Sequence, residues 1–130
     1  MQNPGKLRVT TCARDLVAEL YRATNHFPVS ERFGLTAQMR RAAVSIGSNV
    51  AEGCGKRSRA EGIRYLEIAT GSAAETEHHL AMAADLDILP RNQCAALADE
   101  AEQVGRMIRA LINRFPSSDD AGQAQEVLRT

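Results

Sequence analysis

The apolar residues between positions 97 and 115 alternate steps of four and three along the chain. They are Leu97, Ala101, Val104, Ile108, Leu111 and Phe115. Because an α-helix has about 3.6 residues per turn, this spacing places all six side chains on one narrow stripe. A stripe of this kind is typical of a helix that packs lengthwise against others in a left-handed bundle. The segment therefore predicts a helical bundle, and the rest of the chain must supply its other helices.

Three further segments carry helical apolar spacing and are bounded by capping or helix-breaking residues. Their predicted limits are Thr10 or Thr11 to Phe27, Thr36 to Gly53, and Ser58 to Leu89. Pro28 and Pro90 follow the first and third segments, and proline cannot continue a helix. The third start is a capping box, Ser58-Arg59-Ala60-Glu61, in which serine and glutamate each satisfy a free backbone N–H.

These four segments, joined by short connectors, predict an all-α fold. We expect an up-down-up-down antiparallel four-helix bundle over residues 1–115. Residues 116–130, "PSSDDAGQAQEVLRT", are polar and are predicted to form a flexible C-terminal tail. A chain of 130 residues is one domain of ordinary size.

Several classes of protein are not expected. No run of 18 or more apolar residues occurs, so no membrane span is predicted. The first residues lack the apolar core of a signal peptide, and the three cysteines have no disulfide or metal spacing. We therefore expect a cytoplasmic protein with reduced cysteines.

The second and third segments can form an antiparallel hairpin that turns at residues 55–57. Residues whose numbers sum to about 116 then lie opposite each other. This register predicts two structural ion pairs across the helices, Arg41 with Glu75 and Glu52 with Arg64, and brings Asn49 close to the third helix. The mid-helix glycines 47, 62 and 71 each cost about 1 kcal/mol relative to alanine, and close helix approach is the plainest reason for them.

The same stretch resembles a known family. The motifs "FGLT", "RRA", "SI", "SN", "AEG", "IA" and "GS" follow one another between Phe27 and Glu75. This order resembles the signature of the four-helix bundle family of ribosomal-RNA intervening-sequence proteins. Many relatives have "IPSN" where this chain has Ile46-Gly47-Ser48-Asn49, so the helix bend that proline causes is expected to be softer here.

The resemblance implies a small bacterial bundle protein, similar in fold to accessory proteins of diversity-generating retroelements. It implies a homo-oligomer, most often a ring-shaped pentamer, with no enzymatic activity and a role in binding nucleic acid or another protein. Some of the apolar residues off the main stripes are then expected to be buried between subunits. The apolar residues off these stripes are Val44, Val50, Ile63, Ile88 and Ile112.

Catalytic and metal chemistry find little support in the sequence. Glu75 and His78 form one Glu-x-x-His step, whereas a di-iron bundle needs two such steps and two further glutamates. His78 and His79 are adjacent and point about 100° apart on a helix. No serine has a histidine placed to activate it. We therefore expect no catalytic residue, no metal and no cofactor.

A basic cluster at the turn between the second and third helices is the main candidate site. Its predicted members are Lys56, Arg57, Arg59, Arg64 and, nearby, Arg40. Residues 1–64 hold eleven Lys/Arg and five Asp/Glu, whereas residues 65–130 hold five and eleven. A ring would repeat this cluster around one rim and attract the phosphates of RNA or DNA. The alternative is a ring that binds a partner polypeptide, such as a nucleic-acid enzyme.

Overall fold

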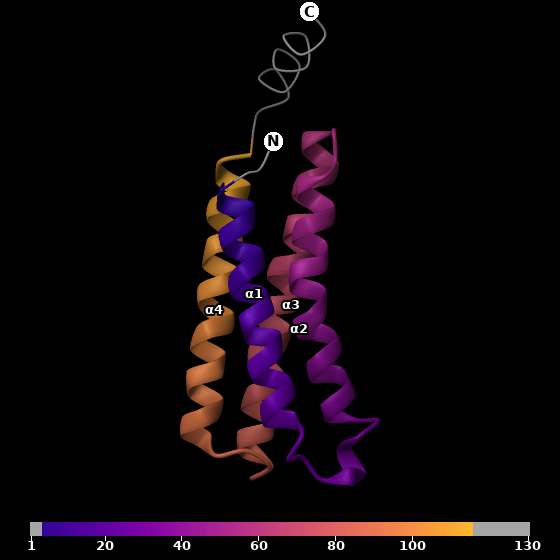
Figure 1. Cartoon of the computed structure of the whole chain (residues 1–130), viewed down its shortest axis with the longest axis vertical. Coiled ribbons are helices and arrows are strands. Elements are labelled where there is room, and N and C mark those ends of the chain that lie inside the picture. The colour runs from indigo at the N-terminus through magenta and orange to yellow at the C-terminus, as the bar shows by residue number, and fades with distance from the viewer. Residues whose placement is uncertain (1–3, 116–130) are drawn as a thin grey trace, which may run out of the picture.

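A computed structural model describes residues 4–115, and four long α-helices make up most of this part of the chain (Figure 1). The helices are α1 (Pro4–Thr24), α2 (Leu35–Cys54), α3 (Arg59–Asp85) and α4 (Arg91–Asn113), and a short 3-10 helix, η1 (Val29–Glu31), precedes α2. They run alternately down and up, and the described range contains no strand. The predicted tail, residues 116–130, lies outside the described residues.

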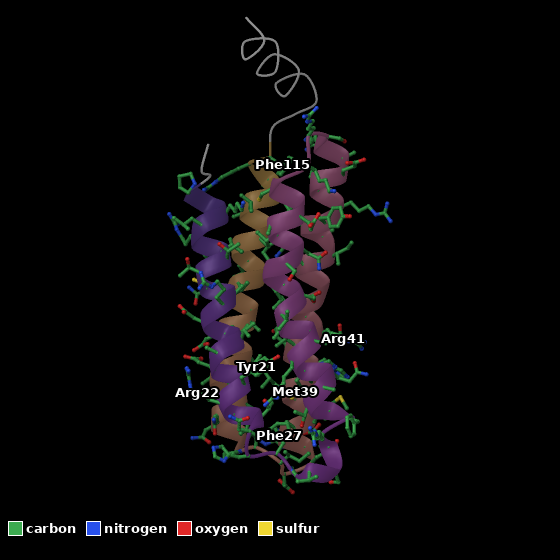
Figure 2. The ribbon with its side chains drawn as sticks, turned by 45° about the vertical axis from the view of Figure 1, so that its right-hand side comes forward. Tyr21, Arg22, Phe27, Met39, Arg41 and Phe115 are labelled. Carbon is green, nitrogen blue, oxygen red and sulfur yellow. The ribbon has the colours of Figure 1, made fainter. Side chains whose placement is uncertain are left out.

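The core follows the bundle axis and is filled from all four helices. Each helix contacts the next in sequence, and α4 also contacts α1. The stripe predicted on the fourth helix is confirmed, because Leu97 to Leu111 are buried along it and Phe115 packs partly buried against the core. Phe115 lies at one end of the bundle and Phe27 at the other (Figure 2).

Helix α1 begins earlier than predicted. It starts at Pro4 rather than at Thr10 or Thr11. Proline suits the first helical position, because the N–H that it lacks would have no partner there. The Thr10 hydroxyl donates to the Lys6 carbonyl at 2.9 Å and therefore bonds back within the helix instead of capping it.

Helix α2 is capped differently from the prediction. Its N-cap is Gly34 rather than Thr36, and the Thr36 hydroxyl is buried without a hydrogen-bond partner within the described range. The Leu35 N–H instead donates to Glu31 Oε2 at 3.2 Å. A carboxylate from η1 thus satisfies one of the free N–H groups at the helix start and also suits the helix dipole.

Helix α3 ends four residues before the predicted limit. Its last residue is Asp85, and Asp87 follows with φ of 56°. The Ile88 N–H donates to the Ala83 carbonyl at 2.9 Å and the Asp87 N–H to the Ala84 carbonyl at 3.1 Å. This is a Schellman motif, with aspartate in the left-handed position that glycine usually fills. The predicted start, in contrast, is confirmed, because Ser58 Oγ accepts from the Glu61 N–H.

Most of the apolar residues named as candidates for subunit contacts instead pack in or against the core of the chain itself. Val50 is fully buried, and Ile88 and Ile112 pack against the core. Val44 is 44% exposed and has no such role. No helix among residues 4–115 has the length and apolar character needed to cross a membrane.

Candidate nucleic-acid interface

The turn between α2 and α3 is held by two glycines at which the helices touch. A Cβ at Gly53 would lie 2.7 Å from the Gly62 carbonyl oxygen, and one at Gly62 would lie 2.9 Å from the Gly53 carbonyl oxygen. No side chain larger than hydrogen fits such distances. The close approach predicted for Gly62 is therefore confirmed, and it leaves Lys56 and Arg57 in the short segment between the helices.

The four basic residues predicted for this turn do lie together. Lys56 Nζ is 3.6 Å from Glu52 Oε2 and 5.1 Å from the centre of the Tyr65 ring. Arg57 and Arg64 are exposed. Arg59 is half-buried, and its Nε is buried without a hydrogen-bond partner among the described residues. The turn therefore presents the guanidinium groups of Arg57 and Arg64 to solvent.

The fold adds basic residues that the sequence analysis missed. The start of α1 and the end of α4 lie at the same end of the bundle as this turn (Figure 1). Lys6 is near enough to act electrostatically on Cys54, although burial dominates and raises the pKa of that thiol. Phe115 packs on Gly62. We call the resulting surface the basic end; its members are Lys6, Arg8, Lys56, Arg57, Arg59, Arg64 and Arg114.

The charge at this end is strongly unbalanced. Among residues 4–115, those seven Lys/Arg residues are accompanied at this end by two acidic residues, Glu52 and Glu61. The added members, Lys6, Arg8 and Arg114, could have been found from the predicted topology. In an up-down-up-down bundle, the first helix starts and the fourth helix ends beside the turn between the second and third helices. Such a surface attracts polyanions, because the electrostatic potentials of neighbouring positive charges add, and at ordinary salt each potential extends about 10 Å before it is screened.

Arg40 was wrongly placed with this cluster. It lies near the opposite end of α2, sixteen residues before Lys56, which is about 24 Å along a helix. Its Nε donates to Thr24 Oγ1 at 2.8 Å, its Nη2 to Asn25 Oδ1 at 3.1 Å, and its guanidinium lies 4.3 Å from the centre of the Tyr21 ring. Arg40 therefore ties α2 to α1 and does not contribute to the basic end.

The predicted ion pair between Arg41 and Glu75 does not form. Arg41 donates to Gln38 Oε1 at 2.6 Å, and Glu75 Oε1 lies 3.6 Å from His79 Nε2. Both charged residues are exposed, so each interacts with a neighbour one turn away on its own helix.

The predicted pair between Glu52 and Arg64 is also absent, because Glu52 pairs with Lys56. Asn49 donates its Nδ2 to the Ser45 carbonyl at 2.8 Å on its own helix. The predicted register is nevertheless close to the observed one, since Ser45 Oγ donates to Ser72 Oγ at 2.6 Å across α2 and α3. The approximate register of the hairpin was therefore predicted correctly, and the charged pairs were not.

The histidines on α3 do not gather metal ligands. Within the described range, no three His, Cys, Asp or Glu side chains come together in a way that could hold a metal ion. His79 is buried, and burial lowers its pKa from the usual value, an effect that the nearby Glu75 carboxylate opposes. His78 is exposed on a different side of the helix. What the observed arrangement offers chemically is a positive surface at one end.

Comparison with known proteins completes this description. A sequence model of the 23S rRNA-intervening sequence protein family matches residues 5–110. The fold is similar to the crystal structure, at 1.70 Å resolution, of a protein with unknown function from the S23 ribosomal protein family of Bacteroides thetaiotaomicron VPI-5482. The TM-score is 0.77 at 22% identity, over 84% of this chain and 98% of that one. No curated protein sequence matches the chain.

Proposed function

From the premise that this chain belongs to the 23S rRNA-intervening sequence protein family, we propose that it is a non-enzymatic scaffold that binds RNA or DNA. It assembles into a ring of identical copies, five as the family resemblance implies, and contacts the nucleic-acid backbone through the basic end. The observation that carries the proposal is that, within the described part of the chain, seven Lys/Arg residues and two glutamates gather at one end of the bundle.

The chemistry of the basic end favours phosphates over bases as the groups that it contacts. Phosphate binding needs positive charge and N–H donors, and the exposed guanidinium groups of Arg57 and Arg64 supply both. Base stacking needs open aromatic faces. Tyr65, the aromatic residue of this turn, has the Lys56 ammonium over its ring. We therefore expect binding without sequence preference and with a strong dependence on salt.

A ring strengthens this effect. Copies related by rotation about an axis along the bundle place all their basic ends on the same rim. Each additional copy adds the same set of charges, so one nucleic-acid strand can contact several copies at once. Multivalent binding of this kind raises the apparent affinity by about 10²- to 10⁴-fold without any new type of contact.

The test is a filter-binding titration of structured RNA and duplex DNA over a series of salt concentrations. The variant Lys56→Gln/Arg57→Gln should weaken binding and lower the slope of log K against log salt by about two units. The matched control, Arg22→Gln/Arg32→Gln, removes the same charge from exposed residues at the opposite end and should leave the slope unchanged. Equal binding by both variants, or no binding by the wild type at low salt, would favour a partner polypeptide instead.

The assembly is measured separately. Light scattering or native mass spectrometry at micromolar concentration should give a closed oligomer, with five copies expected. A stable monomer under these conditions would contradict the ring and the multivalent binding that depends on it. Weaker binding by single copies would still be tested by the titration above.

A further inference from the structure

Two mid-helix glycines are not explained by packing within the chain. Among the residues that the structure describes, a Cβ at Gly71 would have no neighbour within 4 Å, and a Cβ at Gly47 would lie 3.6 Å from Ala13 Cβ, which is ordinary van der Waals contact. Alanine would fit at both positions, and glycine costs about 1 kcal/mol relative to alanine in a helix. The close approach within the chain that explains Gly62 therefore does not explain these two residues.

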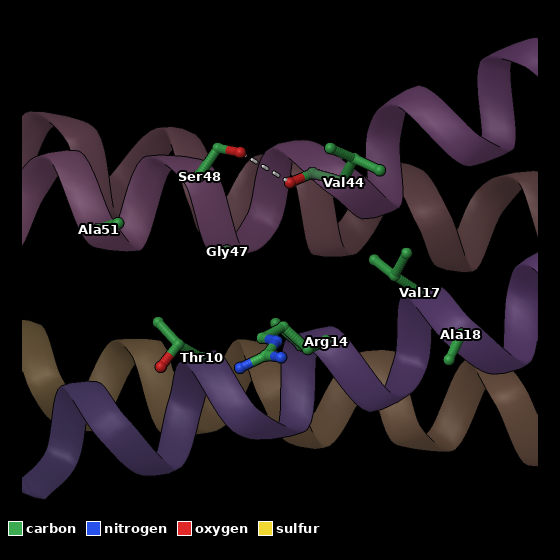
Figure 3. A pocket seen from close by; sticks show the side chains of 9 residues that line it. Thr10, Arg14, Val17, Ala18, Val44, Gly47, Ser48 and Ala51 are labelled. Atoms are coloured by element: carbon green, nitrogen blue, oxygen red, sulfur yellow. Dashed lines mark hydrogen bonds between the residues drawn. The ribbon is translucent and has the colours of Figure 1, made fainter.

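Gly47 forms part of a groove between α1 and α2 (Figure 3). The groove has a volume of about 550 Å³, and its lining residues are mostly small or apolar: Thr10, Ala13, Arg14, Val17, Ala18, Val44, Gly47, Ser48 and Ala51. Val44, at its side, is 44% exposed. An open groove of small residues suits a helix laid along it, because small side chains let the two backbones approach closely.

Gly71 lies on the outer face of α3 at the same height along the bundle. The hydrogen bond between Ser45 and Ser72 sets that height, because it places Gly71 level with the middle of α2. Around Gly71, Ile68 is 45% exposed and Ala74 is exposed. The outer face of α4, in contrast, exposes no large apolar side chain within the described residues. Of these two helices, α3 therefore has the more apolar outer face.

The charges of the two surfaces are complementary. The groove contains Arg14, whereas the face of α3 carries exposed Glu67 and Glu75 one turn on either side of Gly71. The same contrast runs through the chain, since residues 1–64 have six more basic than acidic residues and residues 65–130 six more acidic than basic. An interface that pairs these faces satisfies both charge and shape.

We propose that the outer face of α3 in one copy of this chain docks into the α1–α2 groove of the next copy. Gly71 then faces the groove at the height of Gly47, and Arg14 lies between Glu67 and Glu75 of the neighbouring copy. The two faces differ, so the contact is head-to-tail and repeats until the ring closes. This inference rests on the ring assembly proposed above and names the surfaces that build it.

The principal test is Gly71→Leu, measured by native mass spectrometry and sedimentation of the full chain. We expect the variant to keep its own fold, because a Cβ at position 71 would meet no described atom within 4 Å and leucine favours helix. It should raise the dissociation constant between copies at least about tenfold, because an added side chain overfills a close contact. The matched control, Ala110→Leu, adds the same kind of bulk to an exposed residue of α4 and should leave the assembly unchanged.

Charge exchange gives an independent readout. Arg14→Glu and Glu67→Arg should each weaken assembly about tenfold by placing like charges together, and the double variant should recover most of the loss. Circular dichroism checks that each variant is folded. If Gly71→Leu forms the same oligomer as the wild type, the assigned interface is wrong, but the proposed ring is not contradicted. If the wild type is a monomer, both the interface and the ring are wrong.

Discussion

At the residue scale, Gly53 and Gly62 decide how closely α2 and α3 can meet at their turn. Each would place a Cβ within 3 Å of the other's carbonyl oxygen, and Phe115 packs on Gly62 as well. Backbone cannot move aside as a flexible side chain can. These two positions therefore accept only hydrogen, and they hold Lys56 and Arg57 in place at the end of the bundle.

We predict that Gly62→Ala lowers the free energy of unfolding by about 1–3 kcal/mol, because the added methyl group overfills a packed contact. Chemical denaturation followed by circular dichroism measures the change. Gly55→Ala is the matched control. Its Cβ would lie 3.4 Å from the Ala51 carbonyl oxygen, and we expect it to change stability by less than about 0.5 kcal/mol. Similar losses in both variants would show that the close contact is not responsible.

A pair of carboxyl groups between α1 and α4 is the second feature at this scale. The protonated Glu100 carboxyl donates a hydrogen bond to the side chain of Glu19, and this bond, together with burial and the charges of Glu19 and Asp15, raises the pKa of Glu100 to about 7. Glu100 therefore holds its proton more tightly in the folded chain than in the unfolded one. Its stabilising contribution is complete below about pH 4.5 and is lost as the pH rises through about 7.

We accordingly predict that Glu100→Gln raises the melting temperature at pH 8 and changes it little at pH 4.5. The amide keeps a hydrogen-bond donor and removes the repulsion, and the gain at pH 8 should be about 1 kcal/mol or less because the site is open to solvent. Asp99→Asn removes a neighbouring exposed charge as a control. A gain that does not depend on pH would exclude the shared proton as its cause.

At the scale of the helix, the ends depend on local hydrogen bonds that apolar spacing does not report. The apolar spacing of α3 can be followed to Leu89, yet the helix ends at Asp85. The Schellman bonds at Ala83 and Ala84 close it, with Asp87 at φ of 56°. Aspartate reaches this left-handed conformation more easily than most residues, but glycine reaches it without steric cost.

We predict that Asp87→Gly stabilises the chain by about 0.5–1 kcal/mol, because it relieves the left-handed backbone and removes a negative charge from a helix C-terminus. Thermal unfolding measures the gain. Asp85→Gly removes the same charge two residues earlier, inside the helix, and should instead destabilise the chain by about 0.5–1 kcal/mol. Stabilisation by both changes would attribute the effect to charge alone.

At the scale of the whole molecule, the basic residues fall into two groups with different roles. One group gathers at the basic end, where Arg57 and Arg64 are exposed. Arg40 belongs to the other, because it is used inside the fold to join α2 to Thr24, Asn25 and Tyr21 of the preceding segment. Stability and nucleic-acid binding should therefore respond to different arginines.

We predict that Arg40→Ala lowers the free energy of unfolding by about 1–3 kcal/mol through the loss of charge-assisted hydrogen bonds. It should leave the salt dependence of nucleic-acid binding unchanged. Arg32→Ala, at the same end but exposed, should affect neither property. Denaturation and filter binding on the same preparations measure both. If the Arg40→Ala variant is folded but no longer binds nucleic acid, Arg40 must belong to the nucleic-acid interface after all.

The sequence by itself determined the number and approximate extent of the helices, because apolar spacing and the proline, glycine and serine boundaries are local properties of the chain. The stripe from Leu97 to Phe115 and the cap at Ser58 needed no tertiary information. The register of α2 against α3 could also be predicted approximately, because a short turn between two antiparallel helices restricts how far one can slide along the other. For the same reason the turn residues of the basic end, Lys56 to Arg59, could be recognised from the sequence.

Only the tertiary structure decided which charged side chains meet. Arg41 and Glu52 interact with residues three and four positions away in the chain rather than across the hairpin, because exposed side chains reach such near neighbours at less conformational cost. The tertiary structure also brought Lys6 and Arg114, from opposite ends of the described chain, to the α2–α3 turn. Spacing along a sequence describes one helix at a time, whereas a surface at the end of a bundle is made by all four.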